Sequence, residues 1–444
     1  MDFPSKQNCS ESEDLRKKII ESVKEYATLA HTAPPFDPAT STVPVSGRVY
    51  GSAELVSLTN SALEFWLTTG TFNTQFELLL REYLNTKHVL TVNSGSSANL
   101  LALASLTSYL QKDKAIQPGD EIITCATGFP TTVNPIILYG MIPVFLDVSI
   151  PTYNIDVEAL DEAVTSKTKA IMIAHTLGNP FDLDAVMKVS KKHNLFVIED
   201  SCDALGSMYQ GKPVGTFGDI GTVSFYPAHH ITTGEGGAVF TNRSIIRRAL
   251  ESIRDWGRDC YCPPGVDDSC GRRFDWALGD LPRGFDHKYI YSHLGYNLKL
   301  TDLQAAIGVA QMSRIKEFSD IRHRNFQHLY AGLKEHEEFL ILPEATSGSN
   351  PSWFGFPITI KMESPFTRDE VVRYLNSNRI GTRFLFGGNI TRQPYMKGRS
   401  FRIVGDLTNA DVVTENTFWI GVYPGLTVKH IEYVIDTFNR LFYS

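Results

Sequence analysis

The sequence lacks features that mark several classes of protein. It contains no uninterrupted apolar run of membrane-spanning length, and its first residues, MDFPSKQNCSESEDLRKK, carry acidic side chains instead of the apolar core of a signal peptide. Lys and Arg number 42 against 49 Asp and Glu, so a net charge of −7 supplies no basic footprint for nucleic acid. Internal repeats and low-complexity tracts are missing as well. We therefore expect a cytoplasmic protein that binds neither nucleic acid nor a membrane.

The 444 residues predict an α/β protein of two to three domains. Short apolar runs alternate with helical patterns, which is typical of a mostly parallel sheet covered by helices. We expect an N-terminal helix and linker over residues 1–45, a large α/β domain over 46–313 and a small C-terminal α+β domain over 314–444. The predicted strands are 88–93, 121–125, 142–148, 170–175, 196–200 and 222–226, and two of the predicted helices are 156–164 and 184–193.

Cysteine is scarce, but four of the six cysteines follow a pattern. Cys202, Cys260, Cys262 and Cys270 are separated by 57, 1 and 7 residues, and the last three lie in the polar loop DCYCPPGVDDSC, within a Cys-rich segment at 257–290. Grouped thiols in an intracellular protein indicate metal or catalysis more often than disulfides. Tetrahedral thiolate ligation suits zinc and iron–sulfur equally. A third reading is that these cysteines are small buried hydrophobic residues.

Two predicted strands are followed by residues that suit a phosphorylated coenzyme. Ser94-Gly95-Ser96 opens an apolar helix, where main-chain N–H groups and hydroxyls form an anion site, although Ser94 alone also suits an ordinary helix cap. Asp200 ends the strand FVIED, where its carboxylate could hold a protonated pyridine nitrogen or simply cap a helix.

Further motifs decide between these alternatives. The stretches TVNSGSSANLLAL, MIPVFLDVSIPTYNID, VIEDSCDALGSMYQGKPVGTFGDIG, SFYPAHHITTGEGG and LGYNLKLTDLQAAIG resemble the DegT/DnrJ/StrS family of sugar aminotransferases and dehydratases. The resemblance covers nearly the whole chain from about residue 45. It implies the fold-type I architecture of aspartate aminotransferase: a large, mostly parallel sheet domain and a smaller C-terminal α+β domain.

The resemblance assigns roles to individual residues. It places the coenzyme phosphate at Gly95, Ser96 and Ser224, Phe129 against one face of the pyridine ring, and Asp200 on the ring nitrogen. Asp203 stands where many relatives have His or Gln on the other ring face. Asn297 matches a position that reaches the phosphate of the neighbouring subunit, which implies a homodimer with shared active sites.

The main departure from the aminotransferases is His229. The family's Schiff-base lysine stands at this position, and here no lysine lies within ten residues. An imidazole cannot form a stable internal aldimine, so the coenzyme is expected to be held noncovalently as pyridoxamine phosphate (PMP), with His229 as the general base. His230 is expected to be structural. A non-catalytic binding protein is the alternative from another class.

Lysine-to-histidine replacement is typical of the family's sugar 3-dehydratases. One branch has no cluster, and the other carries a [2Fe–2S] cluster on cysteines with the spacing seen here. The resemblance therefore implies C3 dehydration of CDP-4-dehydro-6-deoxyglucose in dideoxysugar biosynthesis. Completing the deoxygenation needs two electrons. These are expected from a separate flavin and iron–sulfur NAD(P)H reductase, because this chain has no GxGxxG dinucleotide-binding motif after a strand. A TDP-linked sugar, or a cluster-free enzyme, is the alternative. Weaker substrate candidates are Tyr226, Phe354, Arg383 and Arg392.

Overall fold

The computed structural model describes residues 6–32, 34–262 and 265–443. An eight-stranded sheet forms its centre. Six strands run parallel in the order β10, β7, β6, β2, β3, β15, and β11 joins β1 to this set through antiparallel pairs. The strands are β1 (His88–Val92), β2 (Glu121–Cys125), β3 (Ile142–Leu146), β6 (Thr168–Ala174), β7 (Phe196–Asp200), β10 (Ile220–Ser224), β11 (Gly237–Thr241) and β15 (Arg402–Ile403).

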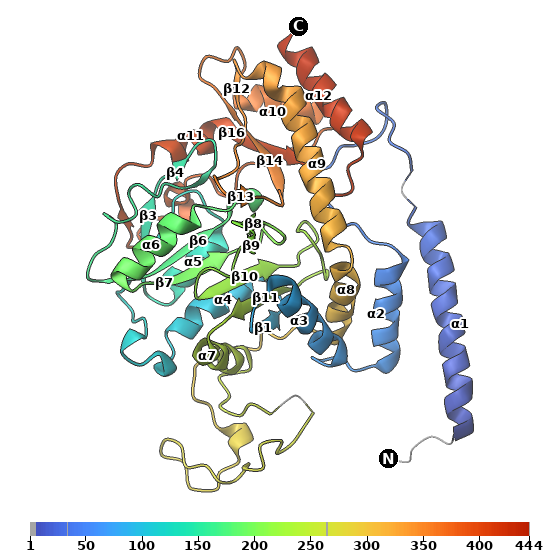
Figure 1. Ribbon diagram of the computed structural model, residues 1–444, viewed down its shortest axis with the longest axis vertical. Helices are drawn as coiled ribbons and strands as arrows, with labels where there is room; N and C mark the ends of the chain where they lie inside the picture. The colour runs from blue at the N-terminus through green and yellow to red at the C-terminus, as the bar shows by residue number, and fades with distance from the viewer. Residues whose placement is uncertain (1–5, 33, 263–264, 444) are drawn as a thin grey trace.

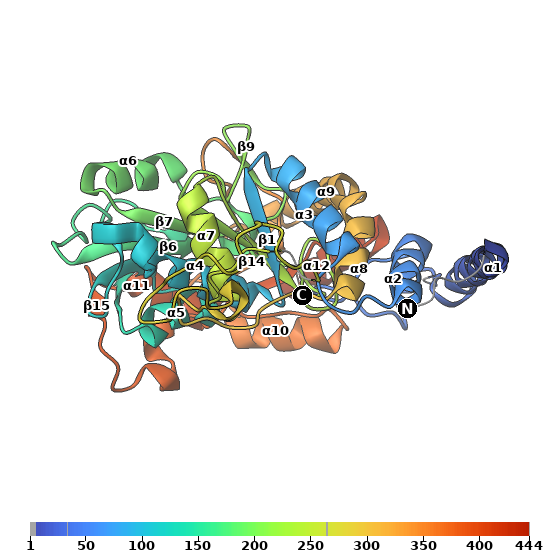
Figure 2. The ribbon, with the colours of Figure 1, turned by 90° about the horizontal axis from the view of Figure 1, so that it is seen from below.

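Both faces of the sheet are covered, which explains why most residues of its strands are apolar. Ile171 and Val197 are register partners that belong to the hydrophobic core on the side of α6 (Leu183–His193). Their neighbours Ala170 and Ile198 belong to the core that contains residues of α4 (Gly95–Leu106), α5 (Pro130–Leu138) and α7 (Ser244–Arg254). Helices α2 (Ser52–Glu64), α3 (Thr71–Leu84) and α8 (Asp302–Met312) pack together beside β1, as Figures 1 and 2 show.

A second, antiparallel sheet lies near the C-terminus of the chain. Its order is β12 (Leu340–Ile341), β14 (Gly355–Ile360), β16 (Thr417–Gly421). Around it lie α10 (Arg368–Ser377), α11 (Thr408–Asn416) and α12 (Val428–Phe442). Short strands complete the fold: β4 (Val148–Ser149), β5 (Asn154–Ile155), β8 (Met208–Tyr209), β9 (Lys212–Pro213) and β13 (Ser349–Asn350).

Helix α9 (Ile315–Leu333) connects the two cores. Its first turns place Ile315 and Phe318 in a core beneath β10 and β11, while Leu329 and Leu333 belong to the core of the small sheet. This helix begins next to the predicted boundary at residues 313 and 314, which remains a prediction. Strand β15, from the C-terminal part, returns to pair with β3 at the edge of the large sheet.

Two segments project from this body. Helix α1 (Lys6–Ala30) lies beside α2 and apart from the sheets, and the segment after α7 forms a long loop at the opposite end from α12 (Figure 1). Residues 1–5 of the predicted N-terminal segment and Pro263 and Pro264 of the Cys-rich loop lie outside the described residues. Within the described ranges, no helix combines the length and apolarity needed to cross a bilayer.

The structure confirms the mostly parallel α/β sheet, and it corrects one predicted helix. Residues 156–164 form successive turns instead of a helix, held by side-chain and main-chain bonds such as Asp156 Oδ1 accepting from the N–H of Glu158. Asp156 therefore stabilises a turn with its own side chain, which competes with helix formation.

Candidate functional site

A cavity of about 580 Å³ lies at the carboxyl ends of β7 and β10. Ligands of open α/β sheets bind at this edge, where the strand ends meet the N-termini of the following helices. The residues that line the cavity include ten of the predicted site residues: Gly95, Ser96, Phe129, Asp200, Cys202, Asp203, Ser224, Tyr226, His229 and Phe354; Arg383 makes an eleventh. The structure thus gathers residues separated by up to 288 positions in the chain.

Asp200 is held in a buried hydrogen-bond network at the end of β7. Its Oδ2 accepts from Nδ2 of Asn99 and Oγ1 of Thr132, both at 2.7 Å, and its Oδ1 accepts from the N–H of Cys202 at 3.1 Å. Oγ1 of Thr222 donates to Oδ1 of Asn99 at 2.7 Å and thereby fixes the orientation of the amide. The carboxylate is preorganised to accept a proton-bearing group from the cavity.

The start of α4 forms a close-fitting cradle beside Ser224. A Cβ atom added to Gly95 would lie 2.5 Å from Cβ of Ser224, so only glycine allows the main chain to approach here. Ser94 is the N-cap, with its hydroxyl accepting from the N–H of Ser97 at 3.0 Å. The first N–H groups of α4 and the nearby hydroxyls suit the phosphate of a coenzyme.

His229 lies between a carboxylate and an aromatic ring. Its Nδ1 is 3.3 Å from Oδ1 of Asp203, and its imidazole stacks on the ring of Phe354 at 5.2 Å between centroids and 26°. The ring of Tyr226 is edge-on at 6.4 Å. With Nδ1 toward Asp203, the second ring nitrogen, Nε2, is the one available for proton transfer.

His230 is buried and is not among the residues that line the cavity, and its structural role remains a prediction. Its Nε2 donates to the main-chain carbonyl of Ser352 at 2.7 Å. Burial, reinforced by the Arg322 guanidinium, holds the pKa of His230 well below its usual value, so this imidazole stays neutral.

Three further candidates have different surroundings. Phe129 lines the cavity with half of its surface exposed, as a side chain that stacks on a coenzyme would. Arg392, a weaker substrate candidate, is not among the lining residues; its guanidinium pairs with Asp411 at 3.0 Å and Glu415 at 3.2 Å. Asn297 also lies outside this cavity, where its Oδ1 accepts from Nζ of Lys299 at 2.7 Å.

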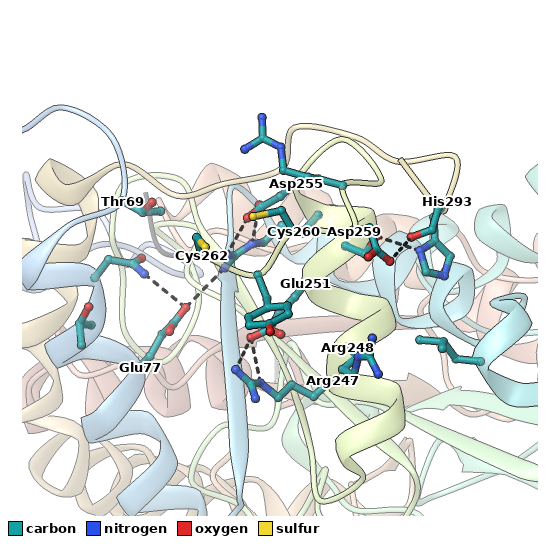
Figure 3. A pocket seen from close by; sticks show the side chains of 18 of the residues that line it. Thr69, Glu77, Arg247, Arg248, Glu251, Asp255, Asp259, Cys260, Cys262 and His293 are labelled. Atoms are coloured by element: carbon teal, nitrogen blue, oxygen red, sulfur yellow. Dashed lines mark hydrogen bonds and ion pairs between the residues drawn. The ribbon is translucent and has the colours of Figure 1, made fainter. Parts of the chain in front are cut away.

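The Cys-rich loop forms part of a second, larger cavity of about 1100 Å³ (Figure 3). Arg254 and Glu77, Arg247 and Glu251, and the thiols of Cys260 and Cys262 line it. The four cysteines are therefore divided: Cys202 lines the coenzyme cavity, Cys260 and Cys262 line this one, and Cys270 lines neither. In the described part of the chain, no three Cys, His, Asp or Glu side chains are arranged to hold a metal ion.

The cysteine thiols have contrasting acidities. Burial, together with the Asp200 and Asp203 carboxylates, raises the pKa of Cys202 well above its usual value. A hydrogen bond from Ser269 lowers the pKa of Cys262 to about 7, and the adjacent Cys260 thiol adds to this effect. Burial raises the pKa of Cys260. The thiols of Cys260 and Cys262 therefore lie close enough to affect each other's pKa, but two adjacent thiols do not by themselves form a four-thiolate site.

Sequence reasoning missed Asn99 and Thr132. Asn99 lies inside a stretch that carries the resemblance, and its signal was a polar residue within the apolar helix of TVNSGSSANLLAL; Thr132 lies outside those stretches. Asn99 is 1 % exposed, and a buried amide of this kind is expected to have a hydrogen-bonding partner.

Comparisons with known proteins agree with this geometry. The chain is 58% identical over 429 residues to the lipopolysaccharide biosynthesis protein RfbH of Salmonella typhimurium, covering 97% of this chain and 98% of that protein. It is 50% identical over 424 residues to dTDP-4-dehydro-2,6-dideoxy-D-glucose 3-dehydratase of Saccharopolyspora spinosa, covering 96% and 91%.

Among solved structures, the chain is similar to E. coli GDP-4-keto-6-deoxy-D-mannose-3-dehydratase with bound hydrated PLP. The TM-score is 0.81 at 30% identity, covering 89% of this chain and 98% of that one. The sequence profile of the DegT/DnrJ/EryC1/StrS aminotransferases matches residues 50–439. The chain belongs to the DegT/DnrJ/EryC1/StrS aminotransferase family.

Proposed function

We propose that the protein is a PMP-dependent 3-dehydratase of a nucleotide-linked 4-keto-6-deoxyhexose. The observation that carries this proposal is the placement of His229, instead of a lysine, in the same cavity as Asp200 and the α4 cradle. Relatives that bear 3-dehydratase names include one named for a dTDP sugar and two named for a GDP sugar. The residues present fit PMP, since the cavity offers a fixed carboxylate, a phosphate cradle closed by Gly95 and an aromatic face at Phe129.

Bound PMP would supply an amine that condenses with the C4 ketone and a pyridine ring that takes up electrons. The chain contributes positioning and proton transfer. Asp200 keeps a proton on the ring nitrogen, and His229 moves a proton at the coenzyme C4′ through Nε2. Gly95, Ser96 and Ser224 hold the phosphate, and Asp203 holds the imidazole. Tyr226, Phe354 and Arg383 are proposed to contact the substrate.

Solvent deuterium exchange at the C4′ of PMP tests the base. The wild-type protein should catalyse this exchange, and His229→Asn should slow it by at least about 100-fold, the usual contribution of a general base. His193→Asn is a matched control, because His193 also pairs with a carboxylate, Asp161, but at the surface. Exchange that survives in His229→Asn would show that another group is the base.

We further propose that Cys202, Cys260, Cys262 and Cys270 hold a [2Fe–2S] cluster. The support is their spacing, together with a net reaction that replaces C3–OH by C3–H and releases water, which consumes two electrons and two protons. The geometry of the single chain does not gather the four thiols, so the proposal requires the loop to bring its cysteines to Cys202. A separate flavin and iron–sulfur NAD(P)H reductase is the proposed electron source.

Anaerobic reconstitution with iron and sulfide tests the cluster. The protein should bind two irons and two sulfides per chain and bleach on reduction. Cys202→Ser and Cys262→Ser should each lose the colour, whereas Cys125→Ser should keep it, because the Cys125 thiol is buried and donates to the carbonyl of Thr127. Stoichiometric zinc in a colourless protein would reject the cluster but leave the PMP chemistry intact.

The proposed sugar is CDP-4-dehydro-6-deoxyglucose. A dTDP-linked sugar is the second candidate, favoured by the relative from Saccharopolyspora spinosa at 50% identity. Single-turnover assays with the CDP, dTDP and GDP forms of one 4-keto sugar decide between them. A higher kcat/KM for the dTDP form would replace the CDP assignment.

We also propose a homodimer through the face around the second cavity. Four aromatic side chains line that cavity: Trp66, Tyr109, Tyr261 and Trp276. Leu294 is 96 % exposed and follows His293, which also lines it. Aromatic side chains are enriched in protein interfaces. Asn297, which lies outside its own coenzyme cavity, is proposed to reach the phosphate of the partner subunit.

A further inference from the structure

Arg322 is a buried cation directly behind the proposed base. It lies on α9, in the stretch between the two cores, and only 1 % of its surface is exposed. Its Nη2 donates to the main-chain carbonyl of His229 at 3.3 Å. Its Nη1 donates to the carbonyls of Trp353 and Phe354 at 3.2 and 3.3 Å. One guanidinium therefore bonds to the base and to the aromatic residue stacked on it.

The surroundings of Arg322 are unfavourable for a buried charge whose only role is to stabilise the fold. Within the described residues no carboxylate lies within ion-pair distance of Arg322; the acidic groups whose fields act on it are Asp203 and the phenol of Tyr423. Burial lowers the pKa of Arg322 to about 9, against the favourable field of Asp203. Charges buried without close pairing are expensive, and apolar side chains of similar volume often stabilise such sites better. A function in placing His229 explains the buried charge.

A second bond reinforces the same connection. His230 donates from Nε2 to the carbonyl of Ser352, so the turn that bears His229 is joined twice to the segment 352–354. Phe354 in that segment stacks on the imidazole of His229. A shift of this turn would change both the direction of Nε2 and the stacking.

We propose that Arg322 is a positioning residue for His229, clamping the turn that carries the base to the segment that carries its stacking partner, Phe354. The proposal rests on His229 being the base of the proposed function. The planar guanidinium suits this task because its donors diverge at fixed angles, which a lysine ammonium does not reproduce. Arg322 itself does not touch the cavity.

The test compares Arg322→Met with Asn325→Leu. Asn325 is a matched control on the same helix: it is equally buried, and its Nδ2 donates to three main-chain carbonyls, of Val422, Tyr423 and Leu426, none of which belongs to the site. Both variants should lower the melting temperature and leave the affinity for PMP within about threefold. Only Arg322→Met should slow C4′ exchange and kcat, by about 10- to 100-fold with little change in KM, the size expected for misplacement of a catalytic group.

Equal rates in the two variants would overturn the proposal. If Arg322→Met does not fold, Arg322→Lys tests the proposal instead, because lysine keeps the positive charge but lacks the diverging donors of the planar guanidinium. We expect Arg322→Lys to exchange at least about fivefold more slowly than wild type, because a slightly misplaced base loses rate. A wild-type rate in this variant would overturn the proposal as well.

A spectroscopic reading separates this proposal from the proposed function. In protein labelled at histidine Cε1, the signal missing in His229→Asn identifies His229. This signal should move in Arg322→Met and stay in place in Asn325→Leu, even if the wild-type protein catalyses no exchange. Absence of exchange in wild type with a shifted signal would reject the base and keep the clamp, while an unmoved signal would reject the clamp.

Discussion

Nδ1 of His229 lies 3.3 Å from the carboxylate oxygen Oδ1 of Asp203. The pair lines the cavity, and Asp203 stands in the turn three residues after Asp200, the last residue of β7. Asp203 therefore has the imidazole of His229 as a neighbour, and its predicted place at one face of the coenzyme ring remains a prediction. It can hold the imidazole by one nitrogen and stabilise the positive charge that His229 gains when it takes a proton.

Asp203→Asn tests this relationship. The amide keeps the shape of the side chain but cannot stabilise the imidazolium, so C4′ exchange should slow by about 10- to 100-fold, part of what a general base contributes. The affinity for PMP, measured by fluorescence titration, should change by less than about threefold. Unchanged exchange would mean that the contact serves packing alone.

Asp200→Asn should have a larger effect than any change to its hydrogen-bond partners. Without the negative charge, the ring nitrogen has no group to keep it protonated, and exchange should fall by about 100-fold or more, as for other preorganised electrostatic groups. Thr132→Val is the control, because it removes one of the bonds to Oδ2 and leaves the carboxylate in place. Similar losses in both variants would indicate that the network, and not the charge, is what matters.

Gly95→Ala tests the phosphate cradle. The added methyl would lie 2.5 Å from Cβ of Ser224 and 3.1 Å from Sγ of Cys202, so α4 or β10 must shift. We expect PMP affinity to fall by at least about tenfold, because the main-chain donors at the helix N-terminus move with it. Gly128→Ala, whose Cβ would have no atom closer than 3.7 Å, should bind PMP normally. Equal affinities in the two variants would argue against the cradle.

The sequence was sufficient to predict the strands whose residues are buried on both faces. Runs such as EIITC and FVIED have consecutive apolar residues, which predict a strand buried on both faces. Strands β2 and β7 begin and end where predicted. Strand β11 was missed because it begins at Gly237, the second of two adjacent glycines, which are typical of loops. Strand β15 was missed because two residues, Arg402 and Ile403, carry no periodicity.

In the site, too, some residues were predictable from the sequence and others were not. Residues at strand ends were predictable, because parallel strands finish at one edge, and Asp200 and Ser224 meet there. Arg322 was not, because nothing in its helical pattern distinguishes a buried arginine from a solvated one. The distance between Cys202 and the loop cysteines was equally unpredictable, since a spacing in sequence fixes no distance through a loop.

Leu294→Asp tests the proposed dimer face. A carboxylate at this exposed apolar position would have to be desolvated in an interface, so the variant should be monomeric by light scattering where wild type is dimeric. Met362→Asp is the control, because Met362 is 85 % exposed and follows β14 on the small sheet. Dimers of unchanged stability in Leu294→Asp would place the interface elsewhere.

Glu121 makes the edge of the large sheet sensitive to acid. Burial alone would raise the pKa of this carboxyl, but hydrogen bonds from Arg402 and Thr165 outweigh it and hold the pKa below its ordinary value of 4.5. A lowered pKa in the folded protein means that the stabilisation is complete above pH 4.5 and is lost as the pH falls through the folded-state value. Strand β15 depends on this pair, since Arg402 belongs to β15 and Glu121 to β2.

Glu121→Gln removes the negative charge from this pair. The free energy of unfolding near pH 7 should therefore fall by about 1 kcal/mol, a modest value because Arg402 is partly exposed. As the pH falls below 4.5 and through the lowered folded-state pKa of Glu121, the two proteins should converge, because wild-type Glu121 becomes protonated too. Glu158→Gln, at an exposed carboxylate, should follow wild type throughout. Urea unfolding of the coenzyme-free protein at several pH values measures the difference, and a gap that does not narrow as the pH falls below 4.5 would show that shape at this position matters more than charge.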